Sequence, residues 1–157
     1  MLDGMNKIQK YQNVISSFSG TLSASLPSGI HLSNLCALIK KEFGFFWVGF
    51  YTRTSENVLT LGPYQGEVPC FTIQLDKGVC GLAAKSGITQ IVNDVHSFPD
   101  YIACHPEPNS EIVAPGIVNG RCEFVLDIDH EEKGYFDDED QKMLEEIVQI
   151  VISNQLA

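Results

Sequence analysis

Residues 112–129 read IVAPGIVNGRCEFVLDID, two runs rich in apolar and β-branched residues on either side of the pair Asn119-Gly120. An Asn-Gly pair between such runs is a strong signal for a β-hairpin, because both residues tolerate the positive φ angles of a type I′ turn. Residues 112–118 and 122–129 are therefore predicted to be paired antiparallel strands. The hairpin indicates that the chain is built around an antiparallel sheet.

The sequence on both sides of this hairpin predicts further helices and short strands. Apolar residues that recur at three- and four-residue steps mark one face of a helix, and short apolar or alternating runs between turn signals mark strands. The order predicts an α+β fold with about six antiparallel strands, the N- and C-terminal helices on one face and a ligand pocket on the other. The helices are expected at 8–18, from about 32 to 44, at 78–85 and after Asp137, and the other strands at 45–51, 58–61, 70–75 and 89–92.

Length and charge limit the classes of function. The 157 residues, 44% of them hydrophobic, suffice for one compact core, so a single domain spanning 1–157 is expected. The sequence contains no run of about eighteen apolar residues and no secretory signal pattern, so a cytoplasmic location is expected. Twenty acidic against ten basic residues give a net charge of −10, which repels phosphate backbones and anionic membranes. Neither a nucleic acid nor a membrane is therefore expected as a partner.

The chain has five cysteines, an odd number without an export signal, which disfavours a permanent disulfide framework. Their nearest spacing is ten residues, and without a C-x-x-C pair a structural zinc site is not expected. No metal and no other cofactor is predicted. Cys36, on an apolar helix face, and Cys122, in phase with Phe124 and Leu126 along its strand, are expected in the core. Cys104 lies in a short apolar patch, where a packed and a reactive thiol are both possible.

Acidic side chains gather on the predicted hairpin. Asp127 and Asp129 are two residues apart in a strand and point to one face, while Leu126 and Ile128 point to the other. Neighbouring carboxylates repel each other, so such a pair is either a solvated edge or a site for a cation or an ammonium group. Glu111 precedes the paired strand and could be a third acid of the same group.

Two aromatic residues share a face of the first predicted strand. Trp47 and Tyr51 are four residues apart, with Gly49 leaving space between them. The pair either packs the sheet or forms an aromatic wall around a small ligand.

Seven short motifs follow one another along the chain: WVGFY at 47–51, LGPYQG at 61–66, KGVCG at 77–81, DVH at 94–96, IAC at 102–104, SEIV at 110–113 and VLDID at 125–129. In this order they resemble the free methionine-R-sulfoxide reductase family. The resemblance implies a GAF fold, a homodimer, thiol chemistry on the R epimer of free methionine sulfoxide, and recycling by thioredoxin. By the same resemblance the catalytic residues are Cys70, Cys80 and Cys104, and the substrate-binding residues are Trp47, Tyr51, Asp94, Glu111, Asp127 and Asp129.

A mechanism follows as a hypothesis. A thiolate attacks the sulfoxide sulfur while an acid protonates the departing oxygen, and the resulting sulfenic acid condenses with a second thiol. We expect Cys104 to attack and either Cys70 or Cys80 to resolve. Cys80 is a rival nucleophile, because it lies near a helix start where the dipole favours a thiolate. The acid is expected to be Glu111 or Asp129, made neutral by crowding.

The sequence departs from the family pattern at two places, His105 with the following Pro106-Glu107-Pro108, and residues 122–124. One alternative reading is therefore a GAF module that senses a small ligand without chemistry. A third is a structural or partner-binding protein, in which the aromatic residues and the acids form only a dimer surface.

Overall fold

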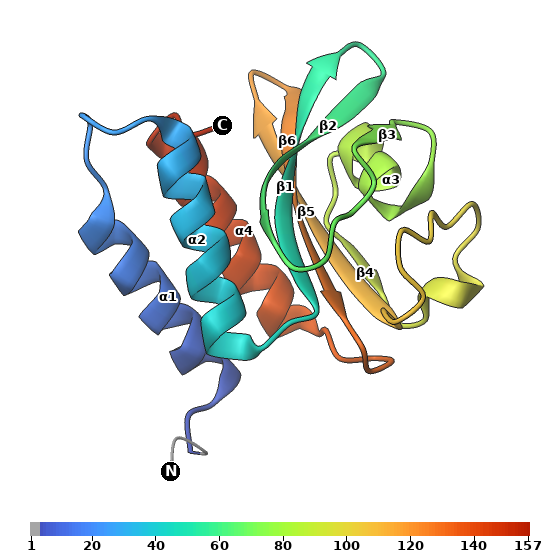
Figure 1. Cartoon of the computed structure of the whole chain (residues 1–157), viewed down its shortest axis with the longest axis horizontal. Coiled ribbons are helices and arrows are strands. Elements are labelled where there is room, and N and C mark those ends of the chain that lie inside the picture. The colour runs from blue at the N-terminus through green and yellow to red at the C-terminus, as the bar shows by residue number, and fades with distance from the viewer. Residues whose placement is uncertain (1–3) are drawn as a thin grey trace.

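The computed structural model describes residues 4–157, arranged as a central sheet with helices on both faces (Figure 1). The six strands form one antiparallel sheet in the order β3-β2-β1-β6-β5-β4, which confirms the predicted α+β architecture. The helices are α1 (Lys7–Thr21), α2 (Ser28–Phe43), α3 (Gly78–Ser86), α4 (Asp138–Ser153) and the short 3-10 helix η1 (Val95–Ser97). The strands are β1 (Trp47–Ser55), β2 (Val58–Gln65), β3 (Thr72–Gln74), β4 (Gln90–Val92), β5 (Ser110–Val118) and β6 (Arg121–His130).

The hairpin predicted from residues 112–129 is present. Asn119 and Gly120 both have positive φ, 51° and 78°, as a type I′ turn requires, and Val118 pairs with Arg121 across it. Strand β2 runs four residues beyond its predicted end at 61. The prediction stopped there because glycine and proline at 62–63 usually interrupt a strand, whereas here they lie at a register shift in the pairing with β1.

A second register shift reverses the side on which Cys122 lies. Gly116 pairs with Phe124 and Ile117 with Cys122, so Glu123 is an extra residue on β6. Phe124 packs with the helices α1, α2 and α4, whereas Cys122 packs with α3. The prediction that Cys122 is buried is confirmed, but the prediction that it shares a face with Phe124 is wrong, because the bulge breaks the two-residue alternation.

The two faces of the sheet have separate cores. Helices α1, α2 and α4 cover one face, where Val48, Phe50, Leu126 and Ile128 are buried (Figure 1). Helix α3 lies on the other face, and its small residues let it approach the sheet closely. A Cβ added at Gly81 would lie 2.6 Å from the carbonyl oxygen of Gln74.

A buried acid joins the first and last helices. Asp140 in the first turn of α4 is fully buried, accepts a hydrogen bond of 2.7 Å from the Tyr11 hydroxyl, and lies 2.6 Å from Lys7 Nζ. Asp137 caps the same helix by accepting from the backbone N–H groups of residues 139 and 140, as its position in the sequence predicts. These contacts hold α1 against α4 on the face of the sheet opposite α3. Among the residues described, no helix combines the length and apolar character needed to cross a bilayer.

Candidate active site

A pocket lies on the face of the sheet that carries α3. Its walls come from β1, β3, β5 and β6, from the first turn of α3, and from the loops before β3 and β5, and it has a volume of about 50 Å³. Seven of the nine predicted site residues line it: Trp47, Tyr51, Cys80, Cys104, Glu111, Asp127 and Asp129.

A disulfide closes one side of the pocket. Cys104 is bonded to Cys70, with their Cα atoms 5.6 Å apart, so the bond links the loop before β3 to the loop before β5. The sequence left Cys70 and Cys80 open as partners of Cys104. The bond joins Cys104 to Cys70, whereas Cys80 is a free, buried thiol.

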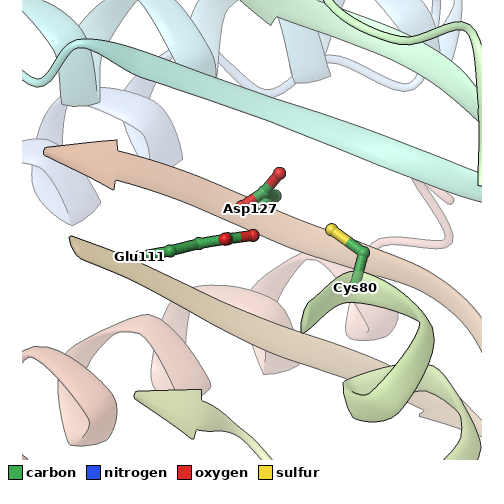
Figure 2. Close-up of side chains that lie close together, drawn as sticks. All are labelled: Cys80, Glu111 and Asp127. Atoms are coloured by element: carbon green, nitrogen blue, oxygen red, sulfur yellow. The ribbon is translucent and has the colours of Figure 1, made fainter. Parts of the chain in front are cut away.

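The three predicted acids converge. Asp127 and Asp129 project from β6, and Glu111 on the neighbouring strand pairs directly with Asp129. Glu111 and Asp127 are each only 6% exposed, and their carboxyl groups lie close together beside the thiol of Cys80 (Figure 2). One oxygen of Asp127, Oδ1, is buried without a hydrogen-bond partner.

Burial and mutual repulsion raise the pKa values of these three acids. Burial, followed by the nearby charges of Asp127 and Asp129, raises the pKa of Glu111 well above its ordinary value. Burial and the charge of Asp127 likewise raise the pKa of Asp129, while burial raises the pKa of Asp127 to about 6. Repulsion among the three groups therefore favours a protonated carboxyl in this cluster near neutral pH.

The surroundings of Cys80 oppose a thiolate in the empty pocket. Cys80 lies in the first turn of α3, where the helix dipole alone would favour the anion. Burial and the charges of Asp127 and Glu111 instead raise the pKa of Cys80 well above its ordinary value. Burial and the acids outweigh the helix dipole and make Cys80 a poor spontaneous nucleophile.

The aromatic wall is present. The rings of Trp47 and Tyr51 stack with centroids 5.8 Å apart, and Tyr64 stacks on Trp47 at 5.6 Å. The absence of a side chain at Gly49 permits this packing, because a Cβ there would lie 2.2 Å from Cη2 of Trp47 and 2.6 Å from Cβ of Tyr64. The predicted space at Gly49 is thus filled by the indole ring.

The segment 67–71, which carries Cys70, is held through its carbonyl groups, while Val68 and Phe71 are 62% and 65% exposed. Hydrogen bonds run from Trp47 Nε1 to Glu67 O (3.1 Å), His105 Nε2 to Val68 O (2.9 Å), Tyr51 Oη to Cys70 O (2.9 Å) and Leu61 N to Phe71 O (2.9 Å). Two of these donors, Trp47 and Tyr51, also line the pocket.

Sequence reasoning assigned no role to Tyr101 and His105, which also line the pocket. Their loop position gave no periodicity to follow, and the only available signal was their closeness to Cys104 in the sequence. His105, noted as a departure from the family pattern, joins the two loops that carry the disulfide through its contact with the Val68 carbonyl.

Asp94 is not brought to the pocket. Its carboxylate accepts from the backbone N–H of His96 at the start of η1 and lies 2.7 Å from Lys133 Nζ. The hydrogen bond from Lys133 lowers the pKa of Asp94. These contacts give Asp94 a structural role and do not support its predicted part in substrate binding.

Fold and site together define a GAF domain whose pocket carries a cysteine pair, and residues 32–151 match the family described as GAF domain. GAF domain-containing protein A of Dictyostelium discoideum is 39% identical over 146 residues, 93% of this chain and 92% of that protein. The free methionine-R-sulfoxide reductase of Saccharomyces cerevisiae is 39% identical over 155 residues, 94% and 86% of the two chains. The reductase of Neisseria meningitidis in complex with its substrate superimposes with a TM-score of 0.92 at 37% identity, covering 98% of this chain and 93% of that one. The chain belongs to the free methionine-R-sulfoxide reductases, a family of oxidoreductases within the GAF domains.

Proposed function

We propose that this protein reduces free L-methionine-R-sulfoxide to methionine, and that the Cys70–Cys104 disulfide is the state the reaction leaves behind. The observation that carries this proposal is a disulfide on the wall of a pocket that three carboxyl groups also line. A sensory module that only binds a ligand needs no such pair of cysteines.

Two cysteines and one carboxyl group account for the atoms, protons and electrons of the proposed reaction. The Cys104 thiolate attacks the sulfoxide sulfur, the departing oxygen receives a proton from Glu111 or Asp129, and methionine leaves with a sulfenic acid on Cys104. The sulfoxide is thereby reduced by two electrons and Cys104 is oxidised. The Cys70 thiol then condenses with the sulfenic acid, which forms the disulfide and releases water.

The carboxyl groups suit an amino acid that is free at its amino end. Asp127 has a buried oxygen without a partner, which a substrate ammonium would satisfy. Binding of that cation removes the charge repulsion within the cluster and leaves a protonated neighbour free to act as an acid. A methionine sulfoxide within a peptide has no ammonium group, so the same site discriminates against it.

Regeneration requires a dithiol, for which thioredoxin is the proposed partner, in a reducing cytoplasm. The disulfide offers a protein reductant a surface, because Cys70 lies between the exposed side chains of Val68 and Phe71. A homodimer is likewise proposed, on the resemblance to the family.

The test measures methionine formed from the R and S epimers of free methionine sulfoxide, with dithiothreitol or thioredoxin as reductant. We expect the wild type to turn over the R epimer only, and Cys104→Ser to turn over neither epimer. Cys70→Ser should form about one equivalent of methionine per chain and then stop. Cys122→Ser serves as the matched control, because this buried thiol lies outside the pocket. Binding of the sulfoxide by well-folded wild-type protein without any turnover would contradict the proposal and favour a sensory module.

A further inference from the structure

The proposed reaction leaves one buried thiol of the pocket unused. Cys80, Glu111 and Asp127 each present one ligand atom, and the three atoms lie within 4.8 Å of one another (Figure 2). All three side chains are buried, and all three line the pocket, so solvent reaches them through its mouth. The cluster is therefore open to a small cation.

A second observation indicates that a cation belongs there. Asp127 is 94% buried (6% exposed), and its Oδ1 atom has no hydrogen-bond partner. Buried carboxylate oxygens are almost always paired, because an unpaired one loses its hydration without compensation. The described residues supply no lysine or arginine to this pocket.

The donor set points to a particular class of metal. A thiolate with two carboxylates suits zinc, which accepts sulfur, nitrogen and oxygen ligands, whereas magnesium and calcium select oxygen alone. Ligand atoms around a tetrahedral zinc lie roughly 3.5 Å apart, as bond lengths of about 2.0–2.3 Å imply. The three ligand atoms lie within 4.8 Å of one another, so side-chain movements of about 1 Å would bring them to that spacing, and a water would complete the fourth position.

We propose that Cys80, Glu111 and Asp127 form a zinc-binding site. Zinc bonds to the Cys80 sulfur and to one oxygen each of Glu111 and Asp127, and the protons that the thiol and any neutral carboxyl held pass to solvent with no change of oxidation state. None of the three ligands takes part in the Cys70–Cys104 bond, so the site exists in the oxidised protein. Zinc there occupies the carboxylates assigned to the substrate ammonium, so metal and substrate exclude each other; this last consequence rests on the proposed function.

The test titrates the oxidised full-length protein with Co²⁺, whose bond to a thiolate gives a near-ultraviolet charge-transfer band. The free thiols in this form are Cys36, Cys80 and Cys122. We expect one Co²⁺ per chain, a charge-transfer band, and loss of the band when Zn²⁺ displaces the cobalt. Cys80→Ser should abolish the band, while Cys36→Ser and Cys122→Ser should keep it, because neither thiol lines the pocket.

Asp127→Asn distinguishes Co²⁺ binding by the three-residue cluster from binding by the Cys80 thiol alone, since it preserves both Cys80 and the shape of the side chain. We expect at least a tenfold weaker Co²⁺ affinity in this variant, with circular dichroism confirming its fold. Absence of the band in the wild type, its persistence in Cys80→Ser, or an unchanged affinity in Asp127→Asn would each overturn the proposal. The readout needs no turnover, so it is independent of whether the protein reduces methionine sulfoxide.

Discussion

Replacement of Asp127 by asparagine should stabilise the fold at neutral pH while it impairs the site. Burial raises the pKa of Asp127 from 3.8 to about 6, so the folded state holds the proton more tightly than the unfolded chain does. Its shift of roughly two pKa units corresponds to about 3 kcal/mol of stability lost once the group is ionised. Asparagine has nearly the same shape and no charge at any pH, so it removes this penalty.

The direction of the Asp127 pKa shift determines how the difference in free energy of unfolding depends on pH. Below the unfolded value of 3.8 both states of Asp127 are protonated, so its ionisation does not separate wild type from variant. As the pH rises through about 6, the wild type loses stability and the variant does not. The difference in free energy of unfolding should therefore grow from near zero at about pH 4 to about 3 kcal/mol at pH values above about 7.

Urea unfolding of the oxidised proteins across this pH range measures the difference. Asp94→Asn is a matched control of opposite sign, because Lys133 lowers the pKa of Asp94 and its removal should reduce stability at neutral pH. A variant no more stable than wild type at neutral pH, or a difference that does not change with pH, would refute the reasoning about the carboxyl cluster.

Two further predictions concern the disulfide segment and the aromatic wall. Phe71→Ser should lower kcat/KM for thioredoxin about tenfold, a loss of about 1.4 kcal/mol of binding, and leave turnover with dithiothreitol unchanged. Ile88→Ser, at a similarly exposed residue of 62%, is its control, and equal losses with both reductants would contradict the assigned surface. Gly49→Ala should displace the Trp47 ring, because the new Cβ would lie 2.2 Å from it, destabilising the fold by about 1–3 kcal/mol and raising KM for the sulfoxide. Gly20→Ala, with nothing within 4 Å of its added Cβ, should be neutral or stabilising in the same unfolding assay, and equal effects of the two substitutions would refute the packing argument.

The sequence predicted the architecture because its strongest signals are local. The Asn119-Gly120 turn, the helical spacing of apolar residues and the two-residue alternation at Asp127 and Asp129 each act over a few residues, and each is present in the structure. The bulge at Glu123 could not be predicted, because it depends on how two strands pair and leaves no distinct mark in composition. That bulge is why Cys122 lies on the unexpected face.

The sequence predicted most of the residues that line the pocket, but fewer of the contacts and pKa effects between them. The convergence of Glu111 with the two aspartates followed from the hairpin register, which the turn sets. The helix position of Cys80 favours a thiolate, whereas the packing of α3 against β5 and β6 buries this thiol beside the acids, and both effects raise its pKa. The contact of His105 with the Val68 carbonyl joins residues 37 positions apart, which no short motif encodes.

The side chains of Trp47 and Tyr51 each have two structural roles. Their rings form the wall of the pocket, while the indole N–H and the phenol hydroxyl hold the segment that carries Cys70. A substitution that replaces either ring therefore also removes a hydrogen bond to the Cys70 segment. The shape of the pocket and the position of one disulfide cysteine thus depend on the same two side chains.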